Sequence, residues 1–243
     1  FLIVFYRSVF GLIIIIPLFA NNKKVFVSSY KYLHFVRAFL KICALTSFFL
    51  AIKSIVLADV TAISFITPIL IILGSVIFLK EKPNKSHLIL ACIGFSGVLF
   101  ILKPGQSSVS MAIYWAVLGA MLGATIQLML KKMSSKDSSH TLIVWNLLCT
   151  VPLAFIPAWF FWVTPSFGMF LLLSLQGLIG VLNMILMTKA MTISDISYLA
   201  PYDFLRLPII SVFAFLFFDE IPELSTLIGA LIIFLSSFLI SNL

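Results

Sequence analysis

The sequence predicts an all-α polytopic membrane protein built from two repeats of opposite topology, with four transmembrane helices in the first repeat and five in the second. Composition is the first observation: 62% of the 243 residues are hydrophobic, 10% are charged, and the mean hydropathy is +1.21. Soluble domains contain about 45–50% apolar and about 25% charged residues. Apolar runs of membrane-spanning length and an internal repeat are the second and third observations.

Clusters of polar, proline and glycine residues separate the apolar runs, most of which come close to the length of about 20 residues that crosses a bilayer. In chain order, the predicted helices cover residues 2–20, 35–55, 60–79, 86–102, 111–130, 141–163, 167–188, 196–218 and 224–241. The chain opens at Phe1, without a methionine and already inside the first apolar run.

The distribution of lysines predicts the orientation of these helices. The loops on one side of the membrane contain Lys23, Lys24, Lys31, Lys80, Lys82, Lys85, Lys131, Lys132, Lys136 and Lys189. The loops on the other side contain Lys53 and Lys103. Because cytoplasmic loops are enriched in Lys and Arg, we expect the first group of loops and the C-terminus to be cytoplasmic.

Residues 80–102 repeat at residues 219–241, with 9 identities in 23 positions at an offset of 139. Shared polar and proline residues carry this alignment, among them Glu81 with Glu220 and Pro83 with Pro222. The loop of Glu81 is predicted to be cytoplasmic and that of Glu220 external. We therefore predict two halves of inverted topology, residues 1–103 and 109–243.

The same offset places a counterpart of helix 111–130 before residue 1. The repeat therefore predicts that the first half lacks its opening helix, so that the sequence is a fragment lacking about 25–35 residues, one span and its connection. Inverted repeats are a device of secondary transporters, which bind substrate near the membrane midplane between the halves.

Several doubled features resemble the EamA-type transporters of the drug/metabolite transporter superfamily. They are Arg7 in the run FYRSVFG, the helix end Ala190-Met191-Thr192, a proline-centred helix closing in a glutamate, and a glycine-bearing final helix. This resemblance implies ten helices in two inverted halves and alternating access to a central cavity. The run from Ala200 to Arg206, followed by Glu220-Ile221-Pro222, resembles the branch that contains the S-adenosylmethionine transporters of intracellular bacteria.

We therefore expect a secondary transporter in the bacterial inner membrane that moves a small, amino-acid-like metabolite, zwitterionic or cationic. Uptake or exchange of S-adenosylmethionine and export of drugs or amino acids are the open alternatives. An intramembrane enzyme is a different class, disfavoured because the sequence has no HExxH motif and its histidines lie in or beside predicted loops. We expect no cofactor, metal or nucleic acid, and a homodimer is left open.

The candidate substrate-binding residues are the polar side chains inside predicted helices. Asp203 and Arg206 share a face of helix 196–218, where they form either an intrahelical ion pair or part of the cavity. Arg7 either extends toward the interface or holds an anionic group. The remaining candidates are Tyr202, Asn146, Asn183, Gln127 and Trp115. For the amides, interhelical hydrogen bonds are the alternative to substrate contact.

Overall fold

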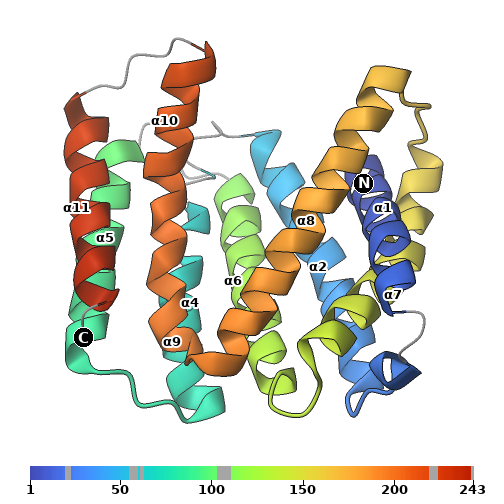
Figure 1. Ribbon diagram of the computed structural model, residues 1–243. Coiled ribbons are helices and arrows are strands. Elements are labelled where there is room, and N and C mark those ends of the chain that lie inside the picture. Colours follow the sequence, from blue (N-terminus) through green and yellow to red (C-terminus); the bar gives the residue numbers. More distant parts are fainter. Residues whose placement is uncertain (20–22, 55–59, 61–62, 103–110, 219–223, 242–243) are drawn as a thin grey trace. The chain divides into compact units, whose positions relative to one another are not determined.

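The computed structural model describes residues 1–19, 23–54, 60, 63–102, 111–218 and 224–241, and the regular elements in these ranges are helices (Figure 1). The helices of eight or more residues are α1 (Leu2–Phe19), α2 (Lys31–Ile52), α4 (Thr67–Gly74), α5 (Lys85–Leu102), α6 (Met111–Met133), α7 (Ser139–Phe160), α8 (Phe167–Ile193), α10 (Arg206–Phe218) and α11 (Leu224–Ser241). Short helical turns are η1 (Lys23–Phe26), η2 (Ser75–Leu79), α9 (Ile196–Leu199) and η3 (Ala200–Leu205).

Four of the described helices are long and apolar enough to cross a membrane: α2, α6, α7 and α8. Shorter apolar stretches occur at Leu2–Pro17, Thr67–Leu79, Lys85–Phe100 and Leu227–Leu239. Large apolar side chains cover the outside of these helices, and Phe167, for example, is 82% exposed. Lipid is the environment in which such a surface is stable. The prediction of an all-α polytopic membrane protein is confirmed.

The predicted helix 196–218 is divided into α9, η3 and α10. Pro201 stands at the start of η3 and has no backbone N–H to donate, so the α-helical hydrogen-bond ladder is interrupted there. The backbone N–H of Arg206 then donates to the carbonyls of Asp203 and Phe204 as α10 begins. A tight turn inside a longer helix commonly marks a hinge.

The predicted helix 60–79 is also irregular where it is described. Its second part is α4 followed by the π-helical turn η2, which ends at Lys80 in a left-handed conformation with φ of 57°. Residues 61 and 62 of this prediction lie outside the described residues.

The starts of two helices carry the offset of the sequence repeat. Helix α4 begins at residue 67 and α10 at residue 206, 139 positions later. These two helices therefore begin at equivalent positions of the repeat. The opposite topology of the halves stays a prediction.

The chain forms two compact units, each drawing on both sequence halves. Unit 1 is Phe1–Ile42 with Met129–Ile193, and unit 2 is Cys43–Leu128 with Ser194–Leu243. In unit 1, α1 packs against α7 and α8. The core of unit 1 consists of Ile15, Val25, Ile143, Val144, Leu147 and Val181.

Helices α1 and α7 run antiparallel in unit 1. Ile15, near the end of α1, packs with Val144 near the start of α7. At the other ends, the rings of Phe5 and Phe155 have centroids 5.5 Å apart. Gly11 allows the close approach, since a Cβ there would lie 3.3 Å from Leu147 and 3.1 Å from Val181.

In unit 2, the repeat-related helices α5 and α11 lie side by side (Figure 1). A Cβ at Gly97 of α5 would lie 3.0 Å from the carbonyl oxygen of Gly229 in α11, so the two backbones touch. One core cluster of unit 2 consists of Phe65, Val98, Phe204, Leu207 and Ile233. Phe204 of η3 belongs to this core, which anchors the irregular segment beside Asp203.

Candidate functional site

Arg37 of α2 is 2% exposed in the interior of unit 1 and contacts α7. Its Nη2 donates to the carbonyl oxygen of Leu142 at 3.1 Å. In the amide orientation that satisfies both groups, the Asn146 side-chain oxygen accepts from Nη2 at 2.8 Å and from Nε at 3.3 Å. The third guanidinium nitrogen, Nη1, is buried without a hydrogen-bond partner in the described part of the chain.

Two further cations lie near Arg37. Lys41 follows it by one helical turn on α2, and the positive charges of Arg7 and Arg37 both act on Lys41. Arg7 extends from α1 over Gly180 of α8, where a Cβ would lie 3.0 Å from the Arg7 Nε. The structure therefore places the predicted residues Arg7 and Asn146 within one cluster of unit 1, together with Arg37 and Lys41.

A second polar cluster in unit 1 joins the segment before α2 to the segment before α7. The Ser28 hydroxyl donates to the Asp137 carboxylate, and the backbone N–H of Ser29 donates to the other carboxylate oxygen at 2.9 Å. His34 Nε2 lies 3.1 Å from the Ser28 hydroxyl and 3.3 Å from Asp137. Both side chains meet the same ring nitrogen, whereas a catalytic triad needs the acid and the nucleophile on opposite ring nitrogens. This cluster ties loops together.

The segment with Asp203 and Arg206 belongs to unit 2. Both side chains are exposed, and within the described residues they form no ion pair with each other. The Arg206 guanidinium instead stacks on the buried ring of Phe65, 4.8 Å from its centroid. Tyr202 donates a hydrogen bond from its hydroxyl to that of Tyr198 at 3.2 Å. One charge of each sign therefore stands at the η3–α10 junction.

Glu81 stabilises the start of this segment. Its two carboxylate oxygens accept from the backbone N–H groups of Ile196 and Ser197, each at 3.1 Å. A carboxylate is favourable there because the first N–H groups of a helix have no intrahelical acceptor.

The other predicted site residues are more dispersed. In unit 2, Gln127 has a buried side-chain oxygen that accepts no hydrogen bond from the described residues, and Trp115 is 38% exposed. In unit 1, the side chain of Asn183 on α8 is exposed.

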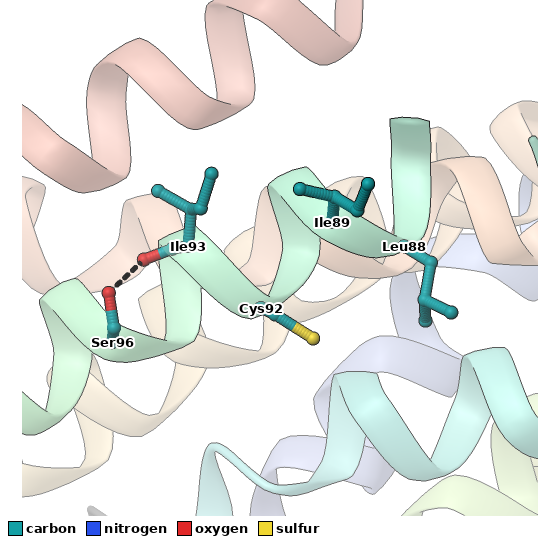
Figure 2. Close-up of a pocket in the computed structure, with 5 residues that line it drawn as sticks. All are labelled: Leu88, Ile89, Cys92, Ile93 and Ser96. Atoms are coloured by element: carbon teal, nitrogen blue, oxygen red, sulfur yellow. Dashed lines mark hydrogen bonds between the residues drawn. The ribbon is translucent and has the colours of Figure 1, made fainter. Parts of the chain in front are cut away.

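A shallow hollow on α5 is apolar. Figure 2 shows that it is lined by Leu88, Ile89, Cys92, Ile93 and Ser96. The Ser96 hydroxyl donates to the Ile93 carbonyl at 2.7 Å, within its own helix. This surface suits an acyl chain better than a charged metabolite.

Sequence reasoning missed Arg37 and the burial of His34. Both stand near the start of α2, which begins at Lys31 rather than at residue 35, so His34 belongs to the helix rather than to its loop, and Arg37 lies six residues inside the helix. The available signal was spacing, because Arg37 and Lys41 are separated by four residues and so share one helical face.

Comparison with known proteins identifies the family. Residues 1–103 and 110–242 match the model of the EamA-like transporter family. The S-adenosylmethionine uptake transporter of Rickettsia felis is 29% identical over 96% of this chain and 80% of its own length. The riboflavin transporter of Vibrio cholerae is 31% identical over 72% of this chain and 59% of its own length.

The fold also matches a known structure. A protein crystal structure with 15% sequence identity has a TM-score of 0.84, covering 99% of this chain and 86% of that one. Family and relatives are transporters of small molecules, which identifies this protein as a multi-pass membrane transporter and not an enzyme. The chain belongs to the EamA-like transporter family.

Proposed function

We propose that this protein imports S-adenosylmethionine, or a metabolite of the same charge pattern, across the bacterial inner membrane. The observation that carries the proposal is the similarity to the Rickettsia felis uptake transporter, which extends over 96% of the chain. Transport would occur by alternating access between inverted halves, residues 1–103 and 109–243, with the C-terminus in the cytoplasm.

The charges inside the helices support this substrate class. S-adenosylmethionine has a sulfonium, an ammonium and a carboxylate, so its binding site needs groups of both signs. We assign Asp203 to a cationic group, and Arg206 or Arg7 to the carboxylate. The remaining proposed contacts are Tyr202, Asn146, Asn183, Gln127 and Trp115. Because Arg206 stacks on Phe65 and forms no ion pair with Asp203 among the described residues, both charges are free to meet a substrate.

Riboflavin is the second candidate, favoured by the 31% identity to the Vibrio cholerae transporter. It is neutral at pH 7, so its binding would depend on aromatic and amide side chains rather than on Asp203. The two candidates therefore differ in their response to removal of that charge.

Uptake by proteoliposomes tests the proposal. Purified protein is reconstituted, and entry of radiolabelled S-adenosylmethionine and of riboflavin is measured for the wild type and for Asp203→Asn and Arg206→Gln. We expect S-adenosylmethionine uptake that falls at least tenfold in both variants. Lys82→Gln, an exposed change in a loop, is the control and should transport normally.

Three outcomes contradict parts of this proposal. Uptake of S-adenosylmethionine no faster than in empty liposomes rejects the substrate. Riboflavin uptake that survives Asp203→Asn selects the second candidate. Unchanged uptake in both variants rejects the site. Green fluorescent protein fused to the C-terminus, which fluoresces when it folds in the cytoplasm, tests the predicted orientation.

A further inference from the structure

We propose that Arg7, Arg37 and Lys41, with Asn146 and Thr150, form a site in unit 1 that binds the carboxylate of the transported metabolite. The proposal rests on the transport function above and extends it, because it adds three residues, Arg37, Lys41 and Thr150, and gives the cluster one ligand group.

The surroundings of these three cations are poor in carboxylates. Segments 1–42 and 129–193 contain a single acidic residue, Asp137, and its carboxylate is already engaged by Ser28 and Ser29. In the described part of the chain, none of the three cations forms an ion pair. An uncompensated charge is costly inside a membrane protein and usually marks a functional site. The cluster therefore needs an anion.

Two buried polar groups of the cluster have hydrogen-bonding capacity that the described residues leave unused. Arg37 is 2% exposed, and its Nη1 has no partner among the described residues. Thr150 is 0% exposed, and its hydroxyl is also without a partner in those ranges. Thr150 lies one turn after Asn146 on α7, and Lys41 lies one turn after Arg37 on α2. Both residues therefore share the helix faces that bring Arg37 and Asn146 together.

The residues of the cluster lie at a similar depth along their helices. The starts of α2 and α7 are joined through Ser28 and Asp137, so the two helices leave the same end of unit 1. Lys41 is ten residues after Lys31, the start of α2, and Thr150 is eleven after Ser139, the start of α7. At the rise of an α-helix both lie about 15–17 Å from that end. Because a bilayer core is about 30 Å thick, this level is near the midplane.

Arg7 reaches the same level from the antiparallel helix α1. It lies twelve residues before Phe19, the end of α1, a distance of about 18 Å. The site thus combines three cations, an amide and a hydroxyl near the middle of the membrane. Among the described residues, Nη1 of Arg37 is the guanidinium nitrogen left to donate to a carboxylate oxygen, and the Asn146 amide holds Arg37 in place.

Binding of a matched pair of ligands tests the proposal. S-adenosylmethionine and its decarboxylated analogue, which differ in the carboxylate alone, are titrated into purified protein in nanodiscs. We expect the wild type to bind the carboxylate form at least tenfold more tightly. Lys41→Gln and Arg7→Gln should abolish this preference while leaving affinity for the decarboxylated analogue unchanged. Lys189→Gln, an exposed charge in unit 1, should preserve it.

A second variant tests the site without any ligand. Asn146→Asp places a carboxylate beside Arg37, so it should raise the unfolding temperature of the empty protein by about 2–4 °C for each kcal/mol gained. It should also weaken S-adenosylmethionine binding, because the site is then occupied. Gln176→Glu, the same amide-to-carboxylate change at an exposed position of α8, is the matched control and should not stabilise the protein.

The two proposals fail separately. If the wild type does not bind S-adenosylmethionine but Asn146→Asp raises the unfolding temperature, the anion site stands and the substrate assignment is wrong. If the wild type transports S-adenosylmethionine, while Lys41→Gln and Arg7→Gln keep the full carboxylate preference and Asn146→Asp does not stabilise, the substrate stands and the anion site is wrong.

Discussion

Glu81 accepts a 3.1 Å hydrogen bond from the backbone N–H of Ile196, although the two residues are 115 positions apart in the chain. The other carboxylate oxygen accepts from Ser197 at the same distance. The loop after η2 thereby holds the start of the segment that continues through η3 into α10. Glu81 aligns with Glu220 in the sequence repeat, and the structure shows what the first of this pair does.

Replacement of Glu81 should loosen the Asp203 segment. Loss of a capping side chain costs about 0.5–2 kcal/mol, so Glu81→Ala should lower the unfolding temperature in detergent. Glu81→Gln, which retains a carbonyl acceptor, should fall between Ala and the wild type. Lys82→Ala in the same loop controls for loss of a surface charge. Equal unfolding temperatures for Glu81→Ala and Lys82→Ala would show that the cap does not stabilise this segment.

Asp137 should be essential for holding the start of α2 next to the start of α7. Its buried carboxylate accepts from Ser28 and Ser29, and hydrogen bonds to a charged group contribute about 1.5–3 kcal/mol each. Asp137→Asn should therefore lower thermal stability and speed proteolytic cleavage of the segment before α2. Ser135→Ala, at an exposed serine of the same loop, should change neither measurement. Cleavage as slow as in the wild type would contradict this role.

Gly97 should be the least replaceable of the α5 glycines. A Cβ at this position meets the Gly229 backbone oxygen at 3.0 Å, and a backbone atom cannot rotate away. Overpacking of a tight contact costs about 1–3 kcal/mol, so Gly97→Ala should reduce the unfolding temperature. At Gly168 of α8, nothing lies within 4 Å of the added Cβ. Gly168→Ala should be neutral or stabilising by up to about 1 kcal/mol, and the reverse order would disprove the packing argument.

Arg206 and Phe65 should be energetically coupled. The guanidinium lies 4.8 Å from the centroid of a fully buried ring, and such cation–π contacts contribute about 0.5–2 kcal/mol. A double-mutant cycle with Phe65→Leu and Arg206→Met, followed by thermal unfolding, should give a coupling energy in this range. Additive effects of the two substitutions would mean that the stacking contributes nothing to stability.

Much of the fold could be predicted because a membrane restricts the length and the composition of the helices that cross it. Helices are predicted at 86–102, 196–218 and 224–241, and the structure is helical over these ranges, apart from the internal division of 196–218. Apolar length and loop lysines are local properties of the sequence, so a single chain reveals them. The division at η3 was also foreseeable, since Pro201 has no N–H to donate.

The candidate site was less accessible to sequence reasoning. Arg7, Asn146, Asp203 and Arg206 stood out because polar residues are rare inside spans. Arg37 was missed, although the predicted helix 35–55 contains it, because only the packing against α7 shows that its side chain is buried. The role of Arg37 depends on its hydrogen-bond partners Asn146 and Leu142, which are more than a hundred residues away in the chain.

By itself, the sequence determined the membrane environment, the helices and the 139-residue repeat, because these follow from hydropathy, breakers and self-similarity along one chain. Tertiary structure alone decided which groups each charged side chain contacts. It placed Arg37 against Asn146, Arg206 on Phe65 and Glu81 at the start of α9. The physical reason is that the energy of a buried charge depends on the partners brought to it by packing, and those partners come from distant helices.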